Sequence, residues 1–181
     1  MDLLPGKQAA ERVAGMLNPK YQVHRFSVHV TARQVYSVDP VGQLDFSGSE
    51  YAPAGMLEIA SQRRQPEDRY GWWDLGRGCY FVECNESLEL AEDEIALLEP
   101  EERLQRAGAT HAPIFLRGRT APILTLVYVD IPRLQIKQNA RISRLRLFRL
   151  SPATLRLSAK VRAAAGKPRK ATKKKSARRA K

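Results

Sequence analysis

Two carboxylates and two guanidinium groups lie within six consecutive residues, in the run Glu101-Glu102-Arg103-Leu104-Gln105-Arg106. A carboxylate can act as a general base or bind a divalent cation, and guanidinium groups bind phosphate oxygens. The residues from Glu101 to Ala107 favour a helix of roughly two turns, because most of them have high helix propensity. A short helix must therefore position whatever chemistry this segment performs.

The two cysteines and three histidines offer no spacing that is typical of a metal site. Cys79 and Cys84 are five residues apart in one expected strand. Their side chains should point to opposite faces, and no disulfide is expected between them. His24, His29 and His111 are isolated among apolar neighbours, so we predict structural or surface roles for them. We expect no metal in the folded domain.

The positive charge of the chain is concentrated at its end. The formal net charge is +12, but residues 152–181 hold twelve of the 31 Lys and Arg residues and no acid, which leaves 19 bases against 19 acids before them. Large apolar residues are almost absent after Val161, so burial cannot offset the entropy cost of ordering this segment. We predict a basic, largely disordered tail over 152–181, with disorder from about residue 165.

A flexible cationic tail without aromatic residues favours contacts with phosphates over stacking on bases. We expect it to bind DNA or RNA without sequence preference. The alternative is a solubilising terminus, or a tail that binds acidic partners indiscriminately. The residues expected to contact nucleic acid are Lys167, Arg169, Lys170, Lys173, Lys174, Lys175, Arg178, Arg179 and Lys181.

The bulk properties predict one ordinary domain. A chain of 181 residues with 43% hydrophobic content can bury its own core. Its start carries Asp2 and no long apolar segment, and it fits neither a signal peptide nor a membrane span. We expect a soluble, cytoplasmic protein with no membrane partner.

The apolar pattern predicts a mainly β fold. Residues 7–17 have helical spacing, closed by Asn18-Pro19, so 1–19 is an expected N-terminal helical segment. From Tyr21 the apolar period changes to two. Strands are expected at 23–30, 35–36, 44–46, 71–75, 79–84, 87–90, 95–98, 113–116, 123–129, 134–136 and 143–150. Many short strands with brief helices predict a distorted barrel or sandwich over 20–151 rather than a βαβ fold.

Adjacent aromatic residues lie on one of these expected strands. Because neighbouring side chains on a strand point to opposite faces, one of Trp72 and Trp73 can face the core and the other the surface or a subunit contact. Core packing is the expected role.

Five segments occur in order over roughly residues 20–151, namely Leu44–Glu50, Cys79–Glu86, Glu99-Pro100, Leu104–Thr110 and Gln138–Leu145, the last followed by Phe148. In these segments the chain resembles the archaeal-type dUTPases and the related dCTP deaminases. The resemblance implies a β-rich, barrel-like domain that assembles as a homotrimer, with nucleotide sites between subunits. It also implies hydrolysis of dUTP to dUMP and pyrophosphate, or deamination of dCTP, with magnesium carried on the triphosphate.

The residues at the family's phosphate-binding positions differ in this chain. The family has Arg-Ser-Ser, then Leu, a variable residue, Arg and a closing Gly, where this chain has the run from Glu101 to Gly108. Glu101 and Glu102 replace an arginine and a serine, and Arg103 and Arg106 lie at further positions of the same run. A carboxylate beside a triphosphate would repel it by about 1 kcal/mol or more per close pair, even in solvent. Phosphate binding in the family's mode is therefore disfavoured.

Other family positions differ as well. The glutamate that shuttles protons in dCTP deaminases corresponds to Thr125, which cannot act as a general base near neutral pH. An aspartate near the first strands corresponds to His29, and a glutamine after the late Ala-Arg-Ile run corresponds to Arg144. The base-binding hairpin and the Asp-Pro-Gly-Tyr segment correspond to residues 111–118, which are shortened and contain no acid.

These differences predict a catalytically degenerate, trimeric dUTPase-like protein. It would serve as a scaffold or regulatory module, need no cofactor, bind nucleotides weakly if at all, and contact nucleic acid through its tail. The alternative is an active dUTP diphosphatase or dCTP deaminase with a rearranged site. In that case Glu101 or Glu102 would hold magnesium or activate water.

Overall fold

The computed structural model describes residues 1–39 and 41–156, and the chain divides into two units, Met1–Leu150 and Ser151–Lys181. In the second unit, residues 152–156 form a helical turn, in which the backbone N–H of Thr154 donates to Oγ of Ser151 at 3.3 Å. The residues predicted to contact nucleic acid, from Lys167 to Lys181, lie outside the described residues. Their disorder and their binding stay predictions.

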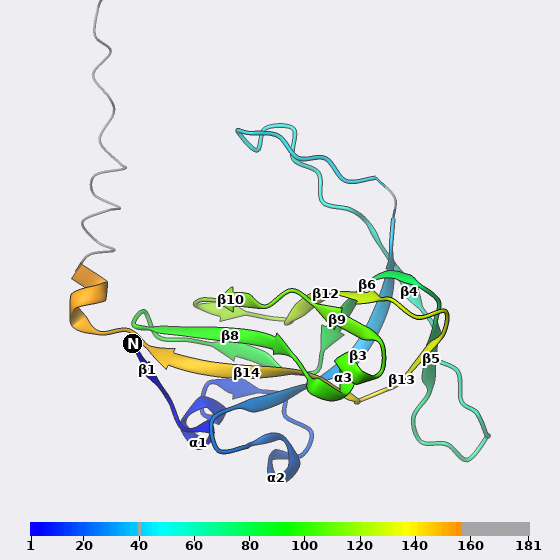
Figure 1. Cartoon of the computed structure of the whole chain (residues 1–181), viewed down its shortest axis with the longest axis horizontal. Helices are drawn as coiled ribbons and strands as arrows, with labels where there is room; N and C mark the ends of the chain where they lie inside the picture. Colours follow the sequence, from blue (N-terminus) through cyan, green and yellow to red (C-terminus); the bar gives the residue numbers. More distant parts are fainter. Residues whose placement is uncertain (40, 157–181) are drawn as a thin grey trace, which may run out of the picture. The chain divides into compact units, whose positions relative to one another are not determined.

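The first unit is built around a curled antiparallel sheet (Figure 1). Its nine strands confirm the predicted mainly β fold, and most of the predicted strands occur within a residue or two of their expected positions. The strands lie in the order β10 (Ile114–Leu116), β8 (Glu94–Pro100), β14 (Arg141–Arg149), β3 (Val28–Val38), β6 (Gly78–Cys84), β12 (Leu124–Val129) and β9 (Ala109–His111), with β1 (Asp2–Leu3) beside β14 and β4 (Met56–Ile59) beside β3.

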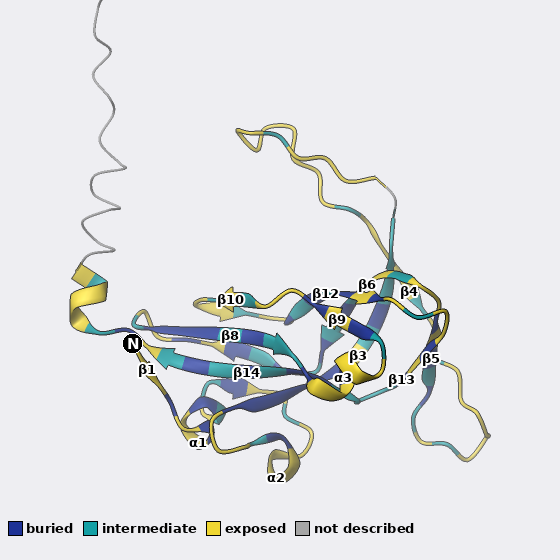
Figure 2. Ribbon diagram, in the orientation of Figure 1, coloured by how far each residue is buried: buried dark blue, intermediate teal, exposed yellow. Residues whose placement is uncertain are grey.

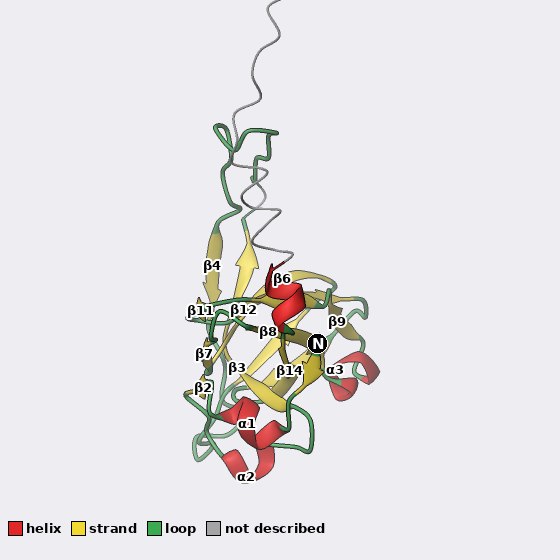
Figure 3. Cartoon of the chain, turned by 90° about the vertical axis from the view of Figure 1, so that its left-hand side faces the viewer, coloured by secondary structure: helices red, strands yellow, loops and turns green. Residues whose placement is uncertain are grey.

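Two smaller sheets and three short helices complete this unit. One sheet has the order β11 (Arg119–Thr120), β7 (Ser87–Glu89) and β2 (Val13–Ala14), and the other pairs β13 (Leu134–Lys137) with β5 (Trp72–Leu75). The helices are α1 (Gly6–Ala10), α2 (Pro19–Gln22) and α3 (Glu102–Arg106). Only α3 matches the predicted helices closely, and it is shorter than the expected two turns. The helix α3 lies beside β14 and β9 (Figure 3).

The long strand β3 causes the sheet to curl. Its first residues pair with β14 and its later residues pair with β6 and β4. The register shifts between Ala32 and Gln34 against β6, and between Arg141 and Ser143 on β14. Such irregularities bend a strand and increase its twist. The strand β3 therefore joins two parts of the sheet that face in different directions.

The core is formed by the inward faces of this curled sheet (Figure 2). Trp73, Leu98, Ile123, Leu145 and Leu147 have no accessible surface. Each such side chain contributes roughly 1.5–3 kcal/mol of hydrophobic stabilisation. The indole N–H of Trp73 donates to the carbonyl of Ile59 at 2.9 Å, so its one polar group is satisfied. The prediction that one of the two adjacent tryptophans faces the core is confirmed.

The predicted helix over residues 7–17 is wrong beyond Ala10. Val13 and Ala14 instead form β2, paired with Leu88 and Ser87 of β7. Gly15 follows at φ 82°, a left-handed conformation that ends any helix and that glycine adopts without steric cost. Pairing with a distant strand overrides the local helical spacing here.

Two further predicted elements differ. Asn18-Pro19 begins α2 instead of closing a helix, because proline at the first helical position needs no N–H partner. The expected strand at 44–46 is a loop with exposed Leu44 and Phe46, and in this region only Gln43 and Ala52 form an isolated bridge. Leu44 and Phe46 alternate with a polar residue as in a strand, but no neighbouring strand in the described part of the chain pairs with them.

Cys79 is exposed and Cys84 is buried at the two ends of β6, and both are free thiols. This confirms that they point to different faces and form no disulfide. Among the described residues, no helix is long and apolar enough to cross a membrane.

A buried carboxylate ties the N-terminal segment to the sheet, and its removal should destabilise the fold. Glu94 of β8 accepts hydrogen bonds from Arg12 at 2.8 and 3.1 Å and from Arg149 at 3.2 Å. The Arg12 guanidinium lowers the pKa of Glu94 to about 2. We expect Glu94→Gln to lower the free energy of unfolding by about 3 kcal/mol, because it leaves the arginines with a weaker partner.

Urea unfolding measures this change. The control is Glu89→Gln, at an exposed position of β7. Its free energy of unfolding should stay within about 0.5 kcal/mol of the wild type. Equal stability of the two variants would show that the Glu94 cluster is not important for the fold.

Candidate functional site

A cavity of about 470 Å³ lies where α3, β13 and the start of β14 meet. Its floor is apolar, formed mainly by Leu104, Leu134, Ile136 and Ile142. Its rim is polar and basic. The remaining wall residues are Trp72, Arg103, Ala107, Gln135, Lys137, Gln138, Asn139, Ala140 and Arg141.

A tight turn between β13 and β14 shapes this cavity. Asn139 lies at its centre with φ 67°, a left-handed conformation that Asn tolerates better than most residues. Its N–H donates to the carbonyl of Ala32 at 2.8 Å, and the N–H of Ala32 donates to the carbonyl of Ala140 at 2.9 Å. The side chain of Asn85 donates to Oδ1 of Asn139 at 2.9 Å. These bonds fasten the turn to β3 and so fix the residues that follow it.

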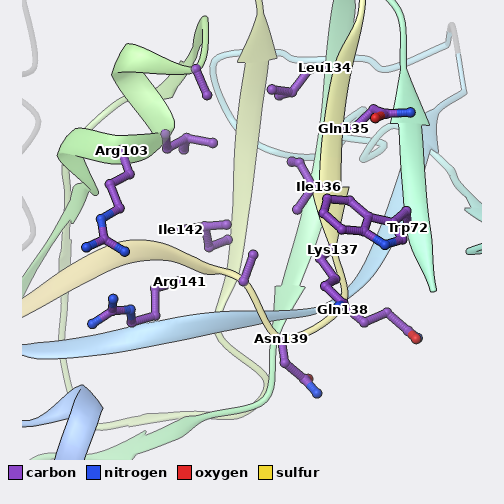
Figure 4. Close-up of a pocket in the computed structure, with 13 residues that line it drawn as sticks. Trp72, Arg103, Leu134, Gln135, Ile136, Lys137, Gln138, Asn139, Arg141 and Ile142 are labelled. Carbon is purple, nitrogen blue, oxygen red and sulfur yellow. The ribbon is translucent and has the colours of Figure 1, made fainter. Parts of the chain in front are cut away.

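The cavity has a cationic side. Arg103 from α3 and Arg141 from β14 both lie on the side of the cavity away from Trp72 (Figure 4). Nη1 of Arg141 donates to the carbonyl of Tyr21 at 3.0 Å, which orients the side chain. An anion bound at this side would be attracted by both guanidinium groups.

Trp72 forms the opposite side of the cavity (Figure 4). Its ring is half-buried, with the guanidinium of Arg64 at 3.7 Å and Nζ of Lys137 at 5.3 Å from the ring centroid. An aromatic ring held by cations is a surface on which a flat, electron-rich ring can stack. The cavity thus combines an anion-binding side, an apolar floor and an aromatic wall.

The structure places the two predicted carboxylates away from this cavity. Glu101 is buried, with Oε2 at 3.4 Å from Nδ1 of His29 and 3.9 Å from Nε of Arg144. None of these three atoms makes a hydrogen bond. Glu102 is exposed and pairs with Arg106 at 2.7 Å along α3. Neither carboxylate lines the wall of this cavity, and the predicted repulsion of phosphate by Glu101 and Glu102 stays a prediction.

His29 is held neutral at physiological pH. Burial is the largest cause that lowers its pKa to about 4, followed by His24 and by the charges of three arginines, Arg141, Arg144 and Arg103. The rings of His24 and His29 are stacked, with their centroids 4.1 Å apart. The contact between His29 and Glu101 is therefore a contact of a neutral ring with a carboxyl group and not an ion pair. His29 belongs to the interior, as the sequence predicted for isolated histidines.

The remaining predicted site residues are dispersed. Thr125 of β12 is buried on the same face as Val127 and Val129, which places it in the core. Arg144 lines a separate cavity of about 290 Å³ together with Glu99 and His111. Nε2 of His111 lies 2.8 Å from Oγ of Ser143, so this histidine has a structural partner. Of the predicted positions, only Arg103 lines the larger cavity.

Three residues of the cavity were not predicted as site residues, namely Arg141, Lys137 and Trp72. For Arg141 the sequence did contain a signal, because this residue lies in the Gln138–Leu145 segment that carried the family resemblance. Trp72 lies more than sixty positions from Lys137 and meets it only because β5 pairs with β13. Among the described residues, no three His, Cys, Asp or Glu side chains lie close enough together to hold a metal ion.

Comparison with known proteins supports the resemblance. No protein-family model matches the chain. Two curated relatives, each called "Probable deoxyuridine 5'-triphosphate nucleotidohydrolase", come from Methanosarcina acetivorans and Methanosarcina barkeri. The first is 28% identical over 136 residues, covering 72% of this chain and 74% of the relative. The second is 28% identical over 135 residues, covering 71% and 73%.

A solved structure shares the fold. The 2'-deoxycytidine 5'-triphosphate deaminase from Agrobacterium tumefaciens aligns with a TM-score of 0.55 at 18% identity, over 87% of this chain. The chain spans about half of the deaminase chain, 53% of its length. The predicted resemblance to the dUTPase and dCTP deaminase superfamily is thus confirmed, and the fold is of that type.

The buried His29 should make stability depend on pH. The unfolded ring has a pKa near 6.5 and the folded ring about 4, so the unfolded chain takes up the proton first. Stability should therefore fall as the pH drops from about 6.5 to about 4, by about 2–3 kcal/mol at most. Burial also lowers the pKa of His111, which adds a loss of the same sign.

Chemical unfolding between pH 7 and pH 4 tests this dependence. We expect His29→Asn to flatten the profile over that range, while His111→Asn removes only its own smaller part. A His29→Asn protein that keeps the wild-type slope would contradict the assignment.

Proposed function

We propose, from the dUTPase and dCTP deaminase-like fold and the composition of the cavity, that this chain binds a deoxynucleotide between α3 and β14 without turning it over. The observation that carries the proposal is a wall with Arg103 and Arg141 on one side and Trp72 on the other. The fold and the similar proteins support a role in nucleotide metabolism of the dUTPase and dCTP deaminase kind.

In this proposal, the phosphates lie at the cationic side of the cavity. Arg103 and Arg141 supply paired donors for phosphate oxygens, whereas Lys137 lies beside Trp72 and adds a positive charge on the aromatic side. Hydrogen bonds to charged groups contribute about 1.5–3 kcal/mol each. The base stacks against Trp72 over the apolar floor. Any magnesium would arrive on the triphosphate, as the resemblance implies.

The absence of turnover is supported by what the wall contains. The described residues that line the cavity include no Asp, Glu or His, so none is suited to activate water near neutral pH. Thr125, at the position of the family's proton-shuttling glutamate, faces the core. The chain would therefore act as a catalytically degenerate scaffold or regulatory module that responds to nucleotide.

Assembly as a homotrimer is part of the proposal. The resemblance implies it, and exposed apolar side chains away from the cavity support association between copies. Several of them lie on the loop between β3 and β4, where Asp45 accepts hydrogen bonds from Ser47 and Ser49 and holds the tip in a defined turn. The exposed residues are Val41, Leu44, Phe46, Tyr51, Met56, Leu57, Phe115 and Tyr128.

Titration of the purified protein with dUTP and dCTP tests the nucleotide proposal. We expect binding, with no release of pyrophosphate or ammonia above background. Arg103→Ala and Arg141→Ala should each weaken binding about 10- to 100-fold, the loss of one charge-assisted contact. Arg106→Ala on the same helix is the control, because Arg106 points to solvent and pairs with Glu102. Equal losses in all three variants would exclude the cavity as the site.

An active enzyme is the second candidate, and one observation favours it. The buried Glu101 lies beside the neutral His29 and near Arg144, a group of residues that could hold water or a metal-bound triphosphate. The curated relatives are named as probable dUTP hydrolases. Pyrophosphate or ammonia release that disappears in Glu101→Gln, while nucleotide binding persists, would establish this alternative.

The tail supplies a second function in the same proposal, non-specific nucleic-acid binding. The twelve bases and no acids after residue 151 support it. Three tails on a trimer would bind far more tightly than one, because the later contacts become intramolecular. The body carries no net charge, so the tail would supply the long-range attraction.

Filter binding with DNA and RNA over a range of salt concentrations tests the tail. The logarithm of the affinity should fall linearly with the logarithm of the salt concentration, because each neutralised phosphate releases counterions. A tenfold rise in salt should lower the affinity by several factors of ten. Most of the affinity should disappear in a chain that ends at Leu150. A response that does not change with salt would rule out electrostatic binding by the tail.

A further inference from the structure

A second cavity adjoins the first. It has a volume of about 490 Å³ and lies between α2, the loop before β5 and the turn at Asn139. Asn139 and Arg141 line both cavities, so the two cavities are neighbours, and we call the pair the depression. The other residues of the second cavity are Leu17, Asn18, Tyr21, Gln22, Thr31, Arg69 and Tyr70.

Aromatic rings with neighbouring cations occur along the whole depression. Tyr21, which is 62% exposed, has Nζ of Lys20 at 5.9 Å from its centroid. The guanidinium of Arg69 lies 5.2 Å from the ring of Tyr70. Trp72 continues the series at the far side of the first cavity, beneath Arg64. Each ring thus has a positive charge next to it.

The lining residues of both cavities include no acid among the described residues. Glu86, which contacts the lining residues Gln22 and Thr31 from beneath, is 1% exposed and therefore cannot face a ligand. It accepts hydrogen bonds from Gln22 at 2.7 Å and from Thr31 at 2.8 Å, and burial raises its pKa. The field in the depression is set by Arg69, Arg141, Arg103 and Lys137.

We infer that the folded domain binds single-stranded nucleic acid across the two cavities. Bases would stack on Tyr21, Tyr70 and Trp72, while the intervening arginines contact the phosphates. Stacking platforms along a cationic groove bind single strands with little sequence preference. A duplex cannot use them, because its bases are stacked on one another. Single-strand binding by the folded domain is a different function from the binding of a free nucleotide and from nucleic-acid binding by the tail. It requires neither of these two functions.

The experiment uses the full-length chain with the nine tail residues Lys167, Arg169, Lys170, Lys173, Lys174, Lys175, Arg178, Arg179 and Lys181 replaced by Gln. This protein is titrated with oligothymidylate of about twelve nucleotides, with oligouridylate of the same length, and with a matched duplex. Tryptophan fluorescence reports stacking on Trp72, and anisotropy of labelled oligonucleotide reports affinity. We expect quenching by one or both single strands, and binding at least about tenfold tighter than to the duplex.

Variants separate this site from the nucleotide site. Tyr21→Leu and Tyr70→Leu should each weaken single-strand binding about fivefold or more. Neither should change the affinity for dUTP, because neither residue lines the first cavity. Phe26→Leu is the control and should change nothing, because Phe26 is an exposed aromatic residue that lines neither cavity.

Two results would overturn the inference. One is equal affinity for duplex and single strand in the tail-substituted protein. The other is single-strand binding that does not respond to either tyrosine variant. Arg69→Gln provides an independent check if a tyrosine variant unfolds, and it should weaken single-strand binding while leaving thermal stability near that of the wild type.

Discussion

The site depends on the hydrogen bonds that fasten the turn at Asn139 to β3. The backbone groups of Asn139 and Ala140 pair with both backbone groups of Ala32, and Asn85 holds the side chain of Asn139. This clamp joins the two-stranded sheet of β5 and β13 to the large sheet. It thereby places Trp72 on one side of the cavity and Arg141 on the other.

The electrostatic balance around this clamp explains why the site is cationic despite two adjacent glutamates. Glu101 is turned inward toward His29 and Arg144, and Glu102 is neutralised by Arg106 on the surface. Both carboxylates therefore lie beside basic side chains of the protein itself. Arg103 and Arg141, in contrast, have no carboxylate partner within 4.0 Å among the described residues. Arg103 and Arg141 therefore supply the positive charge of the cavity, although Glu101 and Glu102 precede Arg103 in the sequence.

The sequence predicted most of the large sheet, and burial alternates along β12 and most of β14 as expected for strands with one buried face. The prediction was wrong at Val13 and Ala14, where pairing with a strand distant in sequence determines the local structure. It was also wrong from Leu44 to Phe46, where an alternating run has no neighbouring strand to pair with among the residues that the structure describes. The site was predicted only at Arg103. Its other walls come from strands separated by many residues, and side-chain direction at Glu101 depends on burial that no local pattern reveals.

In the proposed function, the cavity between α3 and β14 holds a nucleotide through its phosphates. Calorimetric titration with deoxyuridine, dUMP, dUDP and dUTP at constant salt measures the contribution of each phosphate. Affinity should rise with each phosphate up to dUTP, and the rise should be largely lost when Arg103 and Arg141 are both replaced by alanine. Equal affinity for deoxyuridine and dUTP, or an undiminished rise in the double variant, would contradict it.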